Sequence, residues 1–223
     1  MNKQRTIAKI TGYSLVAMAL IAGFSFGFAL PKIFGSNQLE FAQKHLTENL
    51  ELYKFMLFGI LLVILLDVLV SWTLYLFFKD ENKKLAIYSF VFRIIYTLIF
   101  CVATYFLAIN IGQNDNGIVI ENYKLFEYIW SIGLIIFGIH LLIVGQLMRL
   151  HKLIPGILCY LTIIAGASYV LIHTLKITLP QLTNLTNTLN SILALPMVLG
   201  EVGLSVWLII KGGKIEKQTT PNP

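Results

Sequence analysis

The stretch FMLFGILLVILLDVLVSWTLYLFF, residues 55–78, decides the fold class of this chain. As a helix it is long enough to cross the roughly 30 Å hydrocarbon core of a bilayer at about 1.5 Å per residue. Its only charged side chain is Asp67. Five more apolar stretches of similar length occur at residues 7–30, 85–109, 128–148, 155–175 and 191–210. The sequence therefore predicts an all-α, polytopic membrane protein, a bundle of six transmembrane helices.

The composition agrees with this fold class. Of the 223 residues, 57% are hydrophobic and 13% are charged, whereas about 25% of a soluble domain is charged. We expect one membrane domain, residues 1–211, and a disordered cytoplasmic tail, residues 212–223. The formal charge of +6 would suggest nucleic-acid binding in a soluble protein, but the basic residues flank the apolar stretches, as membrane topology requires. We therefore expect contact with the lipid bilayer and no nucleic-acid partner.

The distribution of lysine and arginine predicts the orientation. When the six spans are threaded with the N-terminus inside, eleven of the 17 basic residues lie on that side, five lie on the other and Arg93 lies within the bilayer. The positive-inside rule then places both termini in the cytoplasm. The two cytoplasmic connections, residues 79–84 and 149–154, are short, so the helices they join are expected to be antiparallel neighbours.

The outer connections carry apolar patterns of their own. A stripe in the first connection predicts a short helix that lies on the membrane or caps the bundle; it consists of Leu39, Ala42, Leu46, Leu50 and Tyr53. In the third connection, Pro180 followed by leucines every three or four residues predicts another short surface helix. Within the first span, Ala19, Gly23 and Gly27 predict the close approach of another helix of the same chain, with dimerisation as the alternative.

Five ionisable residues lie inside the predicted spans, and four of them belong together by depth: Asp67, Arg93, His140 and Glu201. Counted from the cytoplasmic ends of four different helices, all four lie about 12–16 Å deep. Ionisable side chains in the hydrocarbon region are costly and face the bundle interior or a watery cavity. The sequence therefore predicts one central polar site. His173 lies about 27 Å from the cytoplasmic edge by the same count, which assigns it to a different layer.

Helical spacing adds polar neighbours to this site. Residues three or four apart share a helix face, so Ser71 is expected beside Asp67, Tyr96 beside Arg93, and Ser205 beside Glu201. A polar seam between the helices is the expected result.

Charge counting indicates what the site does. Two acids against one arginine leave one negative charge uncompensated if His140 is neutral. Either one carboxyl keeps its proton or His140 is protonated. Such a site is suited to binding a small ligand or moving a proton, and the alternative is a static ion-pair network that fixes the helix register.

An enzymatic role is the other alternative. Asp67, His140 and Glu201 are ligand types of a three-ligand zinc site, as in a metal-dependent intramembrane hydrolase. Arg93 at the same depth would repel a dication, however, and no motif places two histidines on one helix face. His140 and His173 differ by about 15 Å in depth, which does not suit a haem between helices. We therefore predict no metal and no cofactor, and we favour a protein that is not an enzyme.

Several segments carry a family resemblance, and they extend over nearly the whole chain: Asp67 with Leu74-Tyr75, Phe92-Arg93-Ile94-Ile95-Tyr96, Gly133-Leu134, Phe137-Gly138-Ile139-His140-Leu141-Leu142, Gly145, Pro155, Gly166, Tyr169, Gly200-Glu201 and Trp207-Leu208-Ile209-Ile210-Lys211-Gly212. In these segments the chain resembles a bacterial integral-membrane family catalogued as a domain of unknown function, family 4386. Gly156 departs from the pattern, where a polar or basic residue is expected after the proline. The resemblance implies a multi-pass protein of the bacterial inner (cytoplasmic) membrane, and it supplies no activity, substrate or cofactor.

The sequence thus predicts a multi-pass inner-membrane protein that binds a small ligand or couples transport to a proton. The predicted site contains Asp67, Arg93, His140, Glu201, Tyr96, Ser71 and Ser205. A metal-dependent hydrolase and a structural membrane partner protein without chemistry are the alternatives. The substrate and the oligomeric state do not follow from the sequence.

Overall fold

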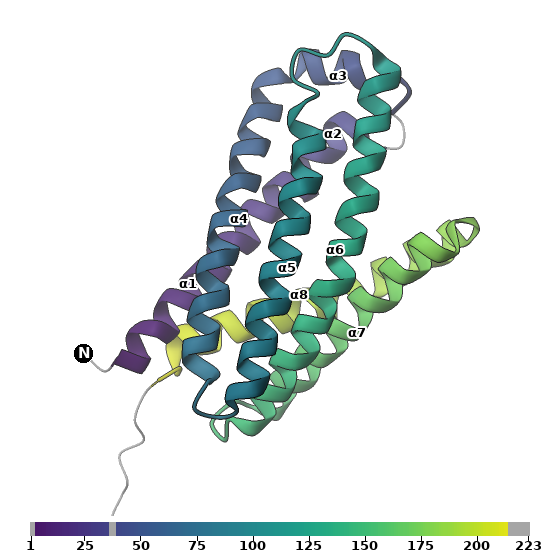
Figure 1. The fold of residues 1–223 in the computed structure, drawn as a ribbon. Coiled ribbons are helices and arrows are strands. Elements are labelled where there is room, and N and C mark those ends of the chain that lie inside the picture. The colour runs from purple at the N-terminus through teal and green to yellow at the C-terminus, as the bar shows by residue number, and fades with distance from the viewer. Residues whose placement is uncertain (1–2, 36–38, 214–223) are drawn as a thin grey trace, which may run out of the picture.

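A computed structural model describes residues 3–35 and 39–213, and these residues contain no β-strand. Six helical segments in this described part are long and apolar enough to cross a membrane (Figure 1). The first runs from Lys3 to Phe34 and has three parts: α1 (Lys3–Phe24), the π-helix η1 (Ser25–Ala29) and α2 (Leu30–Phe34). The others are α4 (Leu50–Phe78), α5 (Lys83–Ala108), α6 (Asn116–Leu150), α7 (Gly156–Thr178) and α8 (Thr183–Ile210). The predicted all-α, six-helix membrane fold is confirmed.

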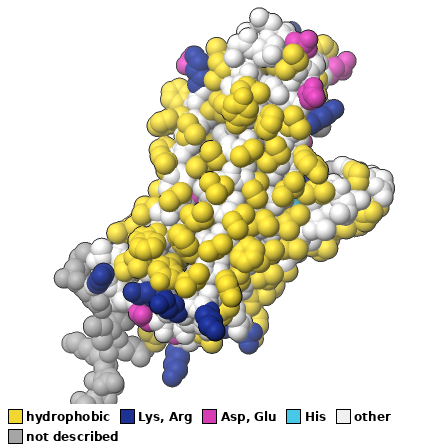
Figure 2. Space-filling view, in the orientation of Figure 1, with side chains coloured by type: hydrophobic (Ala, Val, Ile, Leu, Met, Phe, Trp, Pro, Cys, Tyr) yellow, Lys and Arg dark blue, Asp and Glu magenta, His cyan; other side chains and the backbone are white. Residues whose placement is uncertain are grey.

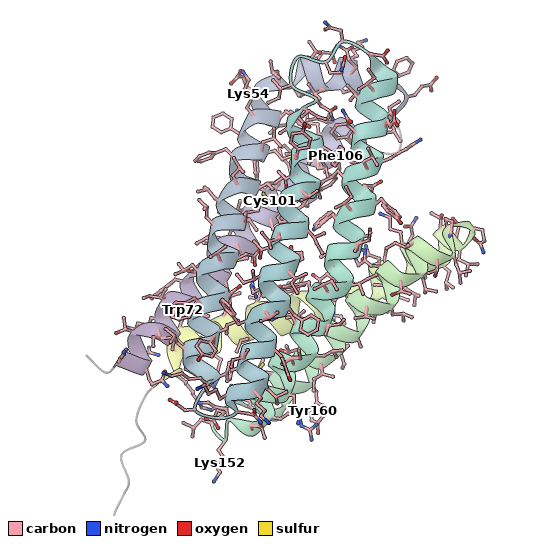
Figure 3. All side chains as sticks on the ribbon, viewed as in Figure 1. Lys54, Trp72, Cys101, Phe106, Lys152 and Tyr160 are labelled. Carbon is pink, nitrogen blue, oxygen red and sulfur yellow. The ribbon has the colours of Figure 1, made fainter. Side chains whose placement is uncertain are left out.

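The two ends of the bundle differ in charge. Lys3 and the last described residues lie at one end, which also holds the α4–α5 and α6–α7 turns (Figure 1). We call this the terminal end and the opposite one the far end. On the face drawn in Figure 2, most basic side chains gather at the terminal end, most acidic ones lie at the far end together with a few basic ones, and a hydrophobic band separates the two charged ends. Trp72 on α4 and Tyr160 on α7 point outward near the terminal end (Figure 3). Exposed tryptophan and tyrosine favour membrane interfaces, so the hydrophobic band is the surface that contacts lipid.

A short helix covers the far end. It is α3 (Ala42–Glu48), preceded by the 3-10 turn η2 (Leu39–Phe41), and Ala42 and Leu46 of the predicted stripe are buried. Asn116 at the start of α6 holds it in place. The Asn116 side chain donates to the Glu40 carbonyl at 2.8 Å and accepts from the Gln43 N–H at 2.9 Å. The first outer helix therefore caps the bundle.

The second predicted surface helix is not a separate element. Only the 3-10 turn η3 (Pro180–Leu182) precedes α8, which begins at Thr183 and continues through Pro196 to Ile210. No glycine or proline lies between Thr183 and Leu195, so nothing in the sequence interrupts the helix there.

Small residues allow the last three helices to cross closely. A Cβ atom at Gly138 of α6 would lie 2.7 Å from the Gly166 carbonyl oxygen of α7, and the reverse distance is also 2.7 Å. Any larger side chain at either position would force the two backbones apart. Toward the far end, the α7–α8 hairpin diverges from α4, α5 and α6 (Figure 1).

α1 and α8 are tied together at the terminal end. A Cβ at Gly12 would lie 2.7 Å from the Ser205 carbonyl oxygen. The Arg5 guanidinium donates to the carbonyls of Leu208 at 3.1 Å, Gly212 at 2.7 Å and Ile209, and so caps the C-terminus of α8. Of the predicted tail, Gly212 and Gly213 form a turn here, and residues 214–223 lie outside the described residues.

Farther along α1 the small-residue stripe does not receive another helix. No described atom other than nearby backbone lies within 4 Å of a Cβ built at Gly23 or Gly27, and both glycines are exposed. The expectation of close helix packing at this stripe was wrong at both glycines. η1 packs on α4, whereas the extensive contact between the first span and α8 is confined to α1. The two helices therefore separate toward the far end and leave space between them.

Candidate functional site

Arg93 forms a buried ion pair with Asp67. The Nε and Nη2 atoms of Arg93 lie 2.9 and 2.6 Å from Oδ1 of Asp67, and both side chains are almost completely buried. The guanidinium carbon of Arg93 also lies 5.5 Å from the centroid of the Phe137 ring, within cation–π range. α4 and α5 are thus joined by a charge pair that α6 covers with an aromatic ring.

His140 extends this pair to a third helix. Nδ1 of His140 lies 2.9 Å from the Ser89 carbonyl oxygen, which can only accept, so Nδ1 carries a hydrogen and donates. Nη1 of Arg93 lies 3.2 Å from Nε2, and because guanidinium only donates, Nε2 accepts. This geometry requires a neutral imidazole with its hydrogen on Nδ1. We call Ser89, His140, Arg93 and Asp67 the Arg93 network.

Beside this network lies a cavity of about 540 Å³, which we call the main cavity. Its walls come from α1, η1, α4, α5, α6, α7 and α8, and they are mainly apolar. Gly23, Gly27 and Asn190 belong to its lining and are themselves exposed, so it opens between the first span and α8. The aromatic residues of the lining are Phe26, Tyr96, Phe100, Trp130, Phe137 and Tyr169.

Two residues of this lining carry buried polar atoms without a hydrogen-bond partner among the described residues. They are Oδ2 of Asp67 and Nδ1 of His173. Unsatisfied buried polar atoms are uncommon in native structures, and each calls for an explanation such as a bound molecule. Asp67 combines this feature with 1% exposure, so its second oxygen has no contact with bulk solvent.

Glu201 lines the same cavity from α8 but lies outside the ion pair. The Tyr169 hydroxyl donates to its Oε1 at 3.1 Å, and the described residues supply no ion-pair partner for it. A second cavity of about 10 Å³, the small cavity, lies between Arg93, His140, Thr162 and Glu201. Its volume suits a single water molecule, and its lining is partly polar. Glu201 thus borders both cavities while the Arg93 network neutralises only Asp67.

Five of the seven predicted site residues lie in the Arg93 network or line the main cavity, and two do not. Asp67, Arg93 and His140 are in direct contact, and Glu201 and Tyr96 line the main cavity with Asp67 and Arg93. The two serines bond to their own helices instead: Ser71 Oγ donates to the Asp67 carbonyl at 2.7 Å, and Ser205 Oγ donates to the Val202 carbonyl at 2.6 Å. Neither serine lines a cavity described here.

Sequence reasoning missed three residues of the main cavity. His173 was assigned to a separate layer, but it lines this cavity and stacks on Tyr169 with ring centroids 6.2 Å apart. Trp130 stacks on Phe26 at 4.4 Å and was not singled out. For Tyr169 a signal existed, because it was among the residues that carry the family resemblance.

The residues of the hydrolase alternative are arranged differently from a metal site. Arg93 contacts both Asp67 and His140, so its positive charge occupies the place a dication would need. Within residues 3–35 and 39–213, no three His, Cys, Asp or Glu residues are grouped as metal ligands.

Comparison with known proteins gives a family but no activity. Residues 10–212 match the sequence model of the family described as "Domain of unknown function (DUF4386)". The chain is also similar to an uncharacterized protein from the archaeon Archaeoglobus fulgidus, with 30% identity over 174 residues, 78% of this chain and 94% of the relative. No solved structure matches. The chain belongs to the DUF4386 family of multi-helix proteins, whose function the comparisons leave open.

Proposed function

We propose that this protein binds a small, largely apolar molecule with a polar group in the main cavity. The observation that carries the proposal is the combination of a cavity of about 540 Å³ with aromatic walls and two buried polar atoms that lack partners among the described residues. Ligand sites in proteins are typically clefts of about 300–1,000 Å³ with mostly apolar walls and a few convergent polar groups.

The Arg93 network and Glu201 have different parts in this proposal. The network fixes α4, α5 and α6 relative to one another, because each of its polar contacts joins two of these helices. Glu201 faces the cavity with one neutral hydrogen-bond donor, so its carboxyl is the group free to exchange a proton with a ligand or with water. A purely structural role accounts for the network but leaves the main cavity and its unpartnered atoms unexplained.

The same proposal includes a location. We assign the terminal end to the cytoplasm and the protein to the cytoplasmic membrane, because nine basic residues of the described part of the chain fall on the terminal side and five on the far side. In a background without Cys101 and Cys159, a cysteine at Lys83 should be shielded from an impermeant thiol reagent in whole cells. A cysteine at Asn114 should react. The reverse labelling pattern would overturn this orientation.

Filling the cavity tests the binding proposal. Gly23→Leu projects a side chain into open space, where an added Cβ meets no described atom, so the fold should tolerate it. Gly156→Leu is the matched control, because Gly156 is equally unobstructed but lies on the exposed first turn of α7, away from the cavity. The readout is the thermal melting of purified protein with a panel of neutral, cationic and anionic aromatic compounds.

A compound that binds only the folded protein raises its stability, by about 2.7 kcal/mol at a hundred times Kd. We expect at least one class of compound to raise the melting temperature of wild type and Gly156→Leu but not of Gly23→Leu. A panel in which no compound stabilises the wild type, or in which all three proteins respond equally, would contradict binding in the main cavity.

A further inference from the structure

The charges around the main cavity do not balance. α1 and η1 contribute no titratable group to its wall. The titratable groups that face Glu201 across the two cavities come from the other helices: Asp67 from α4, Arg93 and Tyr96 from α5, His140 from α6, and Tyr169 and His173 from α7. Of these, Arg93 is the one permanent cation, and two of its nitrogens are held by Asp67 and one by His140.

His140 does not supply a second positive charge. It accepts from Arg93 at Nε2 while it donates to the Ser89 carbonyl from Nδ1, and a protonated imidazole would have to donate from both nitrogens. An ionised Glu201 would therefore add one negative charge to the wall that no described residue neutralises. Glu201 is half-buried in a mainly apolar cavity within the span, where an unpaired charge is costly, so a group in this position binds a proton or a counter-ion.

The aromatic part of the cavity wall is suited to a cation with apolar substituents. The rings of Phe26, Phe100 and Trp130 form a cluster, with centroids 4.4 Å apart for Phe26 and Trp130, 5.8 Å apart for Phe100 and Trp130 and 6.1 Å apart for Phe26 and Phe100. Aromatic faces attract cations, most strongly in sites shielded from water. The Phe137 face is already occupied by Arg93, but no cation of residues 3–35 and 39–213 lies over the cluster of Phe26, Phe100 and Trp130.

We infer that the ligand is a lipophilic organic cation, and that its binding exchanges with a proton on Glu201. The inference rests on the proposed function and specifies its ligand class. As the cation enters, the carboxyl O–H bond breaks, the proton passes to bulk water and the carboxylate becomes the counter-charge of the ligand. The charge inside the cavity is then the same before and after exchange. An anion would meet a guanidinium whose charge Asp67 already neutralises and whose three nitrogens each already donate to Asp67 or His140.

The test uses isothermal titration calorimetry of the full chain in detergent. The probes are tetraphenylphosphonium, its anionic isostere tetraphenylborate, and the neutral triphenylphosphine oxide. Each titration is repeated in two buffers with different ionisation enthalpies, because the difference in heat gives the number of protons released. We expect tetraphenylphosphonium to bind with release of up to about one proton, most completely where the unliganded acid is fully protonated. The other two probes should bind at least about tenfold more weakly.

Glu201→Gln should bind the cation about tenfold or more weakly and release no proton, whereas Glu121→Gln, at an exposed acid away from the cavity, should behave as wild type. Equal binding of all three probes would refute the cation preference while leaving the binding proposal intact. Cation binding without proton release at any pH would refute the exchange. If no probe binds, the cation inference fails, and the melting panel with Gly23→Leu then decides separately whether the cavity binds anything.

Discussion

Two sides of the main cavity each present a carboxyl group, but the two groups have different partners. On the side of α4, α5 and α6, Asp67 receives two contacts from a guanidinium that is itself fixed by His140. On the side of α7 and α8, Glu201 receives one tyrosine hydroxyl and no cation. The sequence places these two acids at similar depth and does not distinguish them. The packing distinguishes them: Asp67 is held in an ion pair, whereas the Glu201 carboxyl is left able to exchange a proton.

Removing Arg93 should have the largest effect on this contrast. Arg93→Met leaves Asp67 buried without its cation, and breaking a buried ion pair from one side costs about 3–5 kcal/mol. We expect the melting temperature in detergent to fall far more than for Lys124→Met, which removes an exposed charge. The double variant Arg93→Met/Asp67→Asn should recover part of the loss. Equal melting of Arg93→Met and Lys124→Met would show that the pair does not hold the wall together.

The next largest difference in stability is expected between variants of two histidines: His140, which lines the small cavity, and His173, which lines the main cavity. His140→Leu removes partners from the Arg93 guanidinium and the Ser89 carbonyl, which should cost about 1–3 kcal/mol of unfolding free energy. His173→Leu is the matched control on the other wall, where Nδ1 has no described partner, and it should cost clearly less. Thermal melting of both variants measures the difference. A larger loss of stability for His173→Leu than for His140→Leu would contradict the view that the wall of α4, α5 and α6 is the one held together by polar contacts.

Replacing two glycines of α1 by alanine should change the stability of the protein in opposite directions. At Gly12 the new methyl group meets the α8 backbone at 2.7 Å, so Gly12→Ala should destabilise by about 1–3 kcal/mol. At Gly23 nothing obstructs it, so Gly23→Ala should stabilise by about 0.4–1 kcal/mol through the greater helix preference of alanine. The comparison is made by melting the two purified variants. The same sign for both would mean that α1 and α8 do not separate as described.

The helices and half of the site could be predicted because each depends on local sequence. Apolar length sets the six spans, and rise per residue correctly brought Asp67, Arg93 and His140 together. His173 was misplaced because depth was treated as a condition for sharing a site. The main cavity reaches along α1 and η1 from Leu15 to Gly27, about 18 Å, so residues at different depths line the same space.

The small-residue pattern shows a second limit of sequence reasoning. Gly12 and Gly23 look alike in a helix, since either can admit a neighbouring backbone or leave a gap. Which occurs depends on where α8 lies, and that is set at a distance, by the Arg5 cap at the terminal end and by the close approach of α8 to α7, where a Cβ at Gly200 would lie 2.9 Å from the Leu161 carbonyl oxygen. Side-chain bonds of Ser71 and Ser205 to their own backbones were also not predictable from helix-face spacing alone.

The central claim is that Glu201, and not Asp67, carries the exchangeable proton. Infrared difference spectroscopy of the unliganded protein in lipid measures this directly, through the C=O stretch of a protonated carboxylic acid on going from acidic to alkaline pH. We expect a band that is present in wild type and in Asp67→Asn and is lost in Glu201→Gln, with Glu121→Gln unchanged. A band lost in Asp67→Asn but retained in Glu201→Gln would contradict the account, because the proton would then lie on the wall that the Arg93 network is said to hold fixed.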